Sequence, residues 1–446
     1  MSDPFKSPKP RDPKMEIIFE DVSAANDGIQ EKESVESQAG LYSGRDGDAL
    51  ALNKDGYVHS DLIVGVQGQQ IAHLSYFCPG LHGKDTKQTI ARKRFTDLLS
   101  GENRFFIPII QRRYCWHDKM IHSWFDDTRN GTRDHLGIHN TGNLVARWSD
   151  LDQGYILIDG QQRVTTTILF LVAIRDVMNT IIERHPGKNA EEEEISAKIL
   201  NKISKMLYIS GNSRLVPCFL DREAFYSILN KQSSQDTSSY QIGAYKILCS
   251  RIQDELRSKP SLMEQLEISR EILSQCARLM GVTWVSIENP IDMSQVFLWL
   301  QEKSFGAGLM FDIPRPGETL VCADLVRNRV LSFLLNKPLQ EQDDFYLKEW
   351  LIPLEQNFKS RDEFNASMKR YTETRRQALQ VKSDFEKQME ILFKSCTGDT
   401  YLELSAYSRF ITVFENMKPR NHNEHHKDIS HEKFIINDMK KFFFSS

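Results

Sequence analysis

The segment YILIDGQQRVTTTILFLVAI constrains the fold of this 446-residue chain more than any other stretch. An apolar run at 155–158 ends at Asp159 and Gly160, and a second segment, 164–182, begins directly after Arg163 and is apolar nearly all round from Ile168 to Ile174. The first run has the length of a buried strand, and the second has the length and all-round apolar character of a buried helix. Glycine permits a tight reversal between them because it has no Cβ. The sequence therefore predicts a strand, a tight turn and a helix.

The turn between these elements carries side chains that suit an anion. Backbone N–H groups at a helix start, together with the helix dipole, favour phosphate. Arg163 adds a guanidinium fork, and Gln161 and Gln162 add uncharged donors and acceptors that could orient a phosphate or a water. Asp159 is compatible with Mg²⁺ held through water, with a general base or with a helix cap. On these residues alone, a phosphate site and a capped turn with Arg163 in a structural salt bridge carry equal weight.

A second motif, IPIIQRRYCW, occupies residues 107–116. Arg112 and Arg113 stand beside Tyr114 and Trp116, a combination that proteins use to stack bases and to contact phosphates. The alternative is a rim where the aromatic rings pack and the arginines face solvent. Taken alone, the segment favours that alternative.

The composition changes along the chain and suggests an α+β protein in four parts. Residues 1–85 are predicted to be mostly disordered, because 16–55 hold ten acidic and three basic residues with few clustered apolar ones. Residues 86–185 combine strand and helix patterns, whereas 186–415 are mostly helical. Residues 416–446 are predicted to be a solvated tail.

The overall charge balance is 57 Lys+Arg against 61 Asp+Glu, a net charge of −4. This excludes a basic coat over the whole protein but leaves room for a local basic groove. Because no run approaches about 18 apolar residues and the N-terminus lacks an apolar signal core, neither a membrane span nor secretion is expected. Seven cysteines without a CxxC pair indicate a reducing compartment. We therefore expect an intracellular protein, cytoplasmic or nuclear.

The two motifs together resemble a known family. FFIPIIQRRYCW, followed by YILIDGQQRVTTTILFLVAIRD, is similar to the pattern IPxYQRxYxW and (V/I)DGQQR(L/V)TT of the N-terminal domain family of GmrSD-type modification-dependent restriction endonucleases. A weaker third match is SQVFLWLQ…GETLVCADLVRN, residues 294–328. The resemblance covers about 86–335. It implies a ParB/sulfiredoxin-like domain followed by a mostly α-helical domain.

The resemblance also implies a function, namely binding of a nucleoside triphosphate with Mg²⁺ and its hydrolysis in support of DNA restriction. We assign Asp159, Gln162 and Arg163 to catalysis, with Asp159 as the metal contact through water. The implied nucleotide-binding residues are Gly160, Gln161, Gln162, Arg163, Thr165, Thr166, Gln111, Arg112, Tyr114 and Trp116. DNA is the expected second partner, and the two motifs are expected to line one cleft.

Restriction members of this family also carry a C-terminal HNH-type nuclease domain. Here fewer than 30 residues follow Arg420, and their histidines are expected to lie in a solvated tail: His422, His425, His426 and His431. We therefore expect the nuclease to be absent or supplied by a separate subunit. Two alternatives stay open. One is a nucleotide-dependent switch or scaffold for DNA or protein with little turnover, and the other is a remnant that keeps only the fold.

Overall fold

The computed structural model describes residues 88–134, 136–234, 239–287, 321–383, 386–387, 399–417 and 430–444. It also describes four two-residue strands nearer the N-terminus: β1 (Tyr42–Ser43), β2 (Ala49–Leu50), β3 (Ile63–Val64) and β4 (Gln70–Ile71). The chain divides into two compact units, Met1–Tyr57 and Val58–Ser446. Everything that follows belongs to the second unit. The predicted disorder of 1–85 and the histidines 422, 425 and 426 lie outside the described residues, apart from those short strands.

A mixed six-stranded sheet forms the centre of this unit. Its strands follow the order β11-β6-β8-β7-β12-β5. Their bounds are β5 (Gln88–Arg94), β6 (Phe105–Phe106), β7 (His139–Ser149), β8 (Gly154–Asp159), β11 (Leu215–Val216) and β12 (Met280–Ile287). Three pairs are parallel (β11 with β6, β6 with β8 and β7 with β12), and the other two are antiparallel.

Both faces of the sheet are buried, as the period-2 alternation of side chains in a strand allows. On β8, Leu157 belongs to one hydrophobic core and its neighbours Ile156 and Ile158 belong to another. The same alternation places Trp284 of β12 in the first core and Val285 in the second. Each face is therefore covered by its own set of helices.

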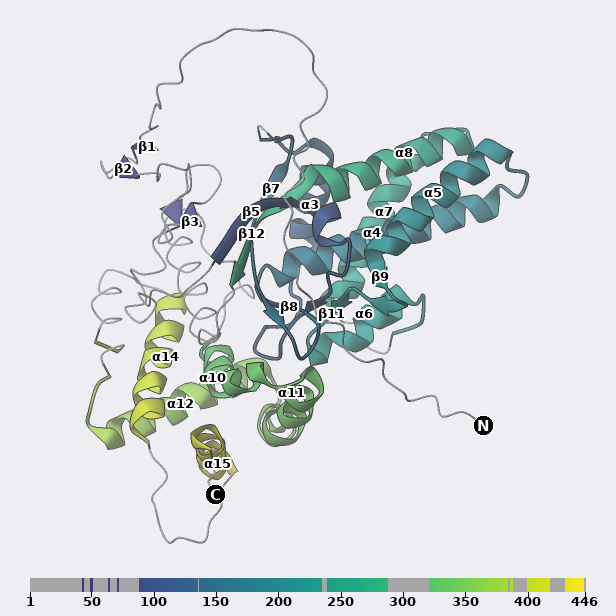
Figure 1. The fold of residues 1–446 in the computed structure, drawn as a ribbon. Coiled ribbons are helices and arrows are strands. Elements are labelled where there is room, and N and C mark those ends of the chain that lie inside the picture. Colours follow the sequence, from purple (N-terminus) through teal and green to yellow (C-terminus); the bar gives the residue numbers. More distant parts are fainter. Residues whose placement is uncertain are drawn as a thin grey trace, which may run out of the picture. The chain divides into compact units, whose positions relative to one another are not determined.

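The first face is covered by helices from the N-terminal two thirds of the chain (Figure 1). These are α2 (Phe95–Leu98), α3 (Asp118–Asn130), α4 (Gln161–Arg184), α5 (Ala190–Leu207), α6 (Arg222–Leu229), α7 (Tyr240–Arg257) and α8 (Leu262–Ser274). Short helices η2 (Phe219–Asp221) and η3 (Gln275–Leu279) and the hairpin β9 (Tyr208–Ile209) and β10 (Asn212–Ser213) connect them. By length and composition α4 could cross a membrane, but most of its apolar window is buried within the protein. It is therefore the central helix of this core.

The second face is covered by helices from the C-terminal third. These are α10 (Cys322–Leu331), η4 (Ser332–Asn336), α11 (Leu339–Phe345), η5 (Tyr346–Leu351), η6 (Glu355–Asn357), α12 (Arg361–Leu379), α14 (Asp399–Asn416) and α15 (His431–Phe444). A bidentate contact between Arg222 on α6 and Asp343 on α11 joins the two helical layers. The Leu339 N–H also donates to the Asp152 carboxylate at 3.2 Å.

The observed organisation differs from the predicted one at three places. Strands β11 and β12 complete the sheet although both lie in 186–415, so residue 185 does not separate a sheet unit from a helical one. Residues 91–99 have apolar side chains at helical spacing, but the helix begins only at Phe95, because residues 88–94 pair along their whole length with β12. The predicted tail contains α15, whose buried Ile435, Ile436 and Met439 belong to the second core.

Candidate functional site

The second motif forms the loop that leaves β6 and leads to α3. Gln111 is buried in this loop, and its side-chain amide donates to the backbone carbonyls of Ile158 and Leu157 on β8. The loop is therefore fastened to the strand that ends at Asp159. Trp116, farther along, is partly buried against the first core, with its ring centroid 5.2 Å from that of Trp124. It is consequently a packing residue in this structure.

The DGQQR turn follows β8 directly and opens α4. Gly160 adopts φ +87°, in the left-handed region that favours glycine. A Cβ at this position would lie 2.5 Å from Leu144 Cδ1 and 2.9 Å from the Asn143 carbonyl oxygen. Backbone conformation and close packing against β7 therefore both require glycine here. No side chain caps the first turn of α4.

The two glutamines of the turn hold the neighbouring loop. Both are buried, and the Gln161 amide donates to the Arg112 carbonyl at 2.9 Å. Gln162 uses both ends of its amide: it accepts from the Cys115 N–H at 3.0 Å and donates to the Arg113 carbonyl at 3.3 Å. The side chains predicted to orient a phosphate are thus engaged with the backbone of residues 112–115.

A chain of hydroxyl groups strengthens this attachment. The Tyr114 hydroxyl lies 2.7 Å from Thr166 Oγ1, which donates in turn to the Gln162 carbonyl at 2.8 Å. Burial raises the pKa of Tyr114 above its ordinary value, so the phenol stays neutral. Thr165 is buried beside Thr166. Tyr114 and Thr166 therefore connect the two motifs, which the sequence could pair only by resemblance.

Arg163 is also engaged by backbone. Its Nε donates to the Thr141 carbonyl at 2.8 Å, and its Nη1 donates to the Asn143 carbonyl at 2.9 Å. These contacts hold the first turn of α4 against the start of β7. Among the described residues, no carboxylate forms the salt bridge that was the alternative for Arg163. Backbone carbonyl oxygens accept its hydrogen bonds instead.

Asp159 is the half-buried last residue of β8. Its carboxylate has no hydrogen-bond or ion-pair partner among the residues that the structure describes, so it keeps its acceptor capacity. Within the same residues, no group of three or more His, Cys, Asp or Glu side chains could hold a metal ion. A cation at Asp159 would therefore need further ligands from a bound molecule.

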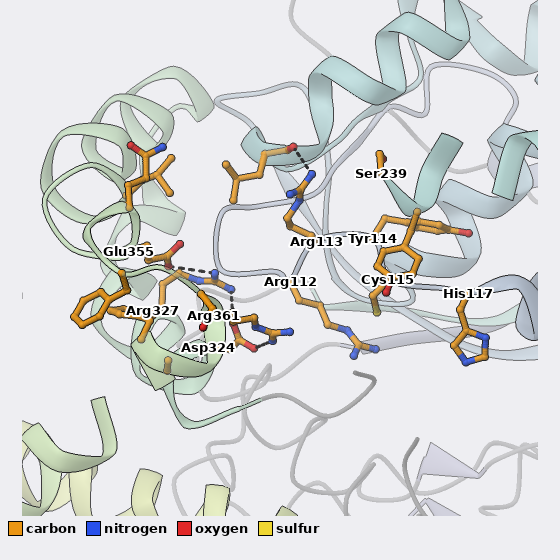
Figure 2. Close-up of a pocket in the computed structure, with 18 residues that line it drawn as sticks. Arg112, Arg113, Tyr114, Cys115, His117, Ser239, Asp324, Arg327, Glu355 and Arg361 are labelled. Carbon is orange, nitrogen blue, oxygen red and sulfur yellow. Dashed lines mark hydrogen bonds and ion pairs between the residues drawn. The ribbon is translucent and has the colours of Figure 1, made fainter. Parts of the chain in front are cut away.

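A cavity of about 570 Å³ lies beside the loop, and we call it the arginine cavity. Its volume falls in the range typical of small-molecule sites. One wall is the loop itself, with Arg112, Arg113, Tyr114, Cys115 and His117 (Figure 2). The facing wall comes from α10, η6 and α12, with Asp324, Arg327, Glu355 and Arg361. No described residue that lines the cavity comes from 159–163, so the DGQQR turn supports the loop from outside the cavity.

Opposite charges are arranged in pairs around this cavity. Arg113 donates from Nε to Asp221 at 3.1 Å, and the other oxygen of Asp221 accepts from the Tyr114 N–H at 2.6 Å. Burial raises the pKa of Asp221, although these two hydrogen bonds act in the opposite direction. On the facing wall, Arg361 pairs with Asp324. The loop and the helices thus each supply arginine side chains to one space.

Arg327 is the most deeply buried of these arginines, with 7% of its surface exposed. Burial lowers the pKa of its guanidinium, but Asp324 and Glu355 raise it by more, and the net pKa lies above the ordinary value. The sequence signal for this wall is the third motif, since Asp324 and Arg327 belong to CADLVRN. That match assigns no site residue, because residues 300–303, LQEK, depart from the Asn-x-Arg-Gly usual in the resembled family.

Comparison with known families bears directly on these motifs. Residues 95–305 match the family model of the GmrSD restriction endonuclease N-terminal domain. The match confirms the resemblance predicted from the two motifs, and it contains both of them. No curated protein matches the chain. The helices that form the second wall of the arginine cavity lie beyond the matched residues.

Proposed function

We propose that this chain binds a nucleoside triphosphate in the arginine cavity and hydrolyses it as part of a restriction-like system that acts on DNA. The observation that carries the proposal is the convergence of arginines from the second and third motifs on one cavity of nucleotide size. Guanidinium groups bind phosphate oxygens through paired, charge-assisted hydrogen bonds. The restriction role comes from the family matched by residues 95–305.

In this proposal the phosphates contact Arg112 and its neighbours, and the DGQQR side chains keep the loop in place. A role for Mg²⁺ depends on Asp159, whose carboxylate is without a partner in the described part of the chain. Mg²⁺ is commonly held by one or two carboxylates together with substrate phosphates and waters. Asp159 does not line the arginine cavity, so the described residues do not fit an ion shared between this carboxylate and phosphates bound in the cavity.

A second candidate is a nucleotide-dependent switch or scaffold with little turnover. It is favoured by one specific observation: the side chains of Gln161, Gln162 and Arg163 are all hydrogen-bonded to backbone groups. These side chains would have to leave their partners to act on a phosphate. In the switch, a nucleotide would instead change how firmly the loop and the C-terminal helices are held together.

Hydrolysis by the purified protein distinguishes the two candidates. We would test four nucleoside triphosphates with Mg²⁺, with and without DNA, for the wild type, Arg112→Ala and Arg251→Ala. Arg251 pairs with Asp126 on the surface outside the cavity and is the matched control. Turnover that is lost only in Arg112→Ala supports the hydrolase, and binding without turnover supports the switch. If no nucleotide binds, both candidates are wrong.

DNA contact is a separate part of the proposal. Protein–DNA affinity that depends on phosphate contacts falls with increasing salt. We expect salt-dependent DNA binding that is weakened in Arg112→Ala. We further propose, from the family resemblance, a ParB/sulfiredoxin-like arrangement of the sheet, an intracellular location and a nuclease supplied by a separate subunit. Purification of the tagged chain from its own cells would test for that subunit.

A further inference from the structure

Arg327 has an unusual hydrogen-bonding state for a buried arginine. Its Nε and Nη2 are buried and have no hydrogen-bond acceptor within the part of the chain that the structure describes. Two carboxylate oxygens lie nearby, Asp324 Oδ1 at 3.6 Å from Nη2 and Glu355 Oε1 at 3.6 Å from Nη1. Both distances allow ion pairing but exceed hydrogen-bond length. The guanidinium is therefore neutralised in charge while its donors remain unsatisfied.

The two carboxylates are directed to other partners. Asp324 pairs through Oδ2 with Arg361. Glu355 accepts from Trp350 Nε1 at 2.6 Å and from the Tyr346 hydroxyl at 3.1 Å. These contacts hold each carboxylate where it is. Arg327 consequently cannot satisfy its donors by a small rotation of either neighbour.

A second buried arginine of this protein shows the usual arrangement. Arg214 is 5% exposed, and its Nε and Nη1 donate to the carbonyls of Lys205, Gly101 and Asn103 at 2.8–2.9 Å. Leaving a buried charged donor unsatisfied is costly in free energy, so native proteins rarely do it without reason. Arg214 borders a separate pocket with these donors satisfied, whereas Arg327 lines the arginine cavity with two donors unsatisfied.

Arginines and carboxylates from both walls surround the cavity. Among the described residues these are Arg112, Arg113, Arg327 and Arg361, with Asp221 on Arg113 and the pair Asp324 and Glu355 on the facing wall. Tyr346 and the thiol of Cys218 are the other titratable groups near Arg327, and burial raises the pKa of both, so they carry no charge. An anion that enters this space meets guanidinium groups from both walls.

We propose that Arg327 is the receptor for a phosphate-type anion at the α10 wall of the arginine cavity. The anion would accept hydrogen bonds from the guanidinium that no protein group accepts. The inference rests on the proposed function for the larger ligand, of which this anion would be a phosphoryl group. It adds that helices outside residues 95–305 complete the binding site.

Calorimetric titration with inorganic pyrophosphate tests this assignment. We would compare the full-length wild type with Arg327→Lys, which keeps the positive charge beside Asp324 and Glu355 but loses the paired donors. Arg214→Lys is the matched control, because it makes the same change at a buried arginine away from the cavity. We expect pyrophosphate affinity to fall by at least about tenfold in Arg327→Lys and to be unchanged in Arg214→Lys. Equal affinity in all three proteins would overturn the inference.

A second measurement uses the wild type alone, so it tests the inference even if Arg327→Lys does not fold. Crystals of the wild type soaked in tungstate, a heavy analogue of phosphate, should show an anomalous peak within hydrogen-bond distance of Arg327. A peak elsewhere, or none, would overturn the assignment.

The outcome can be separated from that of the proposed function. Nucleotide binding that needs Arg112 but is unaffected by Arg327→Lys would contradict only the inference. Pyrophosphate binding that needs Arg327, in a protein that binds no nucleotide, would support the inference and contradict the proposed function.

Discussion

At the scale of single residues, the DGQQR motif acts through hydrogen bonds to backbone. Gln161 and Gln162 fasten the loop 112–115, and Arg163 fastens the start of β7. The chemistry of the motif is therefore indirect in this structure. Its residues determine where Arg112 and its neighbours stand.

Gln162→Glu tests this role, because the substitution keeps the size of the side chain. A carboxylate can still accept from the Cys115 N–H but cannot donate to the Arg113 carbonyl, which it would instead repel. We expect unfolding free energy to fall by about 1–3 kcal/mol, measured by urea denaturation. Ligand affinity should fall as well, although Gln162 does not line the cavity. A variant as stable as the wild type would show that the hydrogen bonds of Gln162 do not hold the loop 112–115 in place.

Three glycine substitutions separate strain from crowding. Gly160→Ala combines φ +87° with a clash against Leu144, so we expect a loss of at least about 1–3 kcal/mol. Gly211→Ala meets φ +80° in open space, and its loss should be smaller. Gly243→Ala lies within α7 in open space and should stabilise the protein by up to about 1 kcal/mol. Thermal unfolding of the three variants measures these stability changes and ranks them. If Gly160→Ala costs no more than Gly211→Ala, close packing against β7 is not important.

Cys249 gives a prediction of pH dependence. Burial raises the pKa of its thiol from 9.0 to about 11. Because the folded pKa lies above the unfolded one, its contribution to stability is complete below about pH 9 and is lost as the pH rises through 11. Only the thiolate is alkylated, so at pH 8 iodoacetamide should modify Cys249 about 100-fold more slowly than an ordinary thiol. Peptide mass spectrometry measures the rate, which should rise about tenfold per pH unit to pH 10. A plateau near pH 9 would contradict the prediction.

At the scale of elements, the sequence predicts β8, the turn and α4 well because a long apolar run can form only a buried helix there. The run VTWVSI within β12 has the composition of a strand, but its place in the sheet cannot be predicted, since pairing with β5 and β7 depends on residues far apart in the chain. The same limit applies to the cavity. Arg327 and Arg361 lie across the cavity from the loop of the second motif only in the folded protein, and no local sequence pattern relates the two segments.

Helix α15 was the least expected element. Asp438 accepts from Arg375 Nε and Nη2 at 2.8 and 2.9 Å and from the Tyr371 hydroxyl at 3.0 Å. The polar composition of the preceding residues suggests a tail, whereas the apolar residues of 434–439 pack against α10 and α12. Their spacing is helical and could have indicated this.

Asp438→Ala tests the docking of α15. The substitution leaves the buried Tyr371 hydroxyl and the Arg375 guanidinium without their acceptor, so unfolding free energy should fall by about 1–3 kcal/mol. Asn437 is exposed on the same helix. Asn437→Ala is therefore the control and should change stability by less than about 0.5 kcal/mol. Hydrogen exchange of α15 should rise in Asp438→Ala alone. Equal exchange in both variants would mean that this contact does not hold the helix.

At the scale of the whole molecule, two helical layers cover one sheet, and the arginine cavity lies where the second motif meets the second layer. A family domain at 95–305 thus contributes one wall, and helices outside it contribute the other. Ligand binding should therefore require both.

The most direct test of this account is a crystal structure of the full chain with Mg²⁺ and a non-hydrolysable nucleoside triphosphate analogue. The account predicts phosphate groups in the arginine cavity, in contact with Arg112 and Arg327, with the hydrogen bonds of Gln161 and Gln162 to the loop intact. Phosphates bound instead by the turn at 159–163, with those glutamine hydrogen bonds broken, would contradict it.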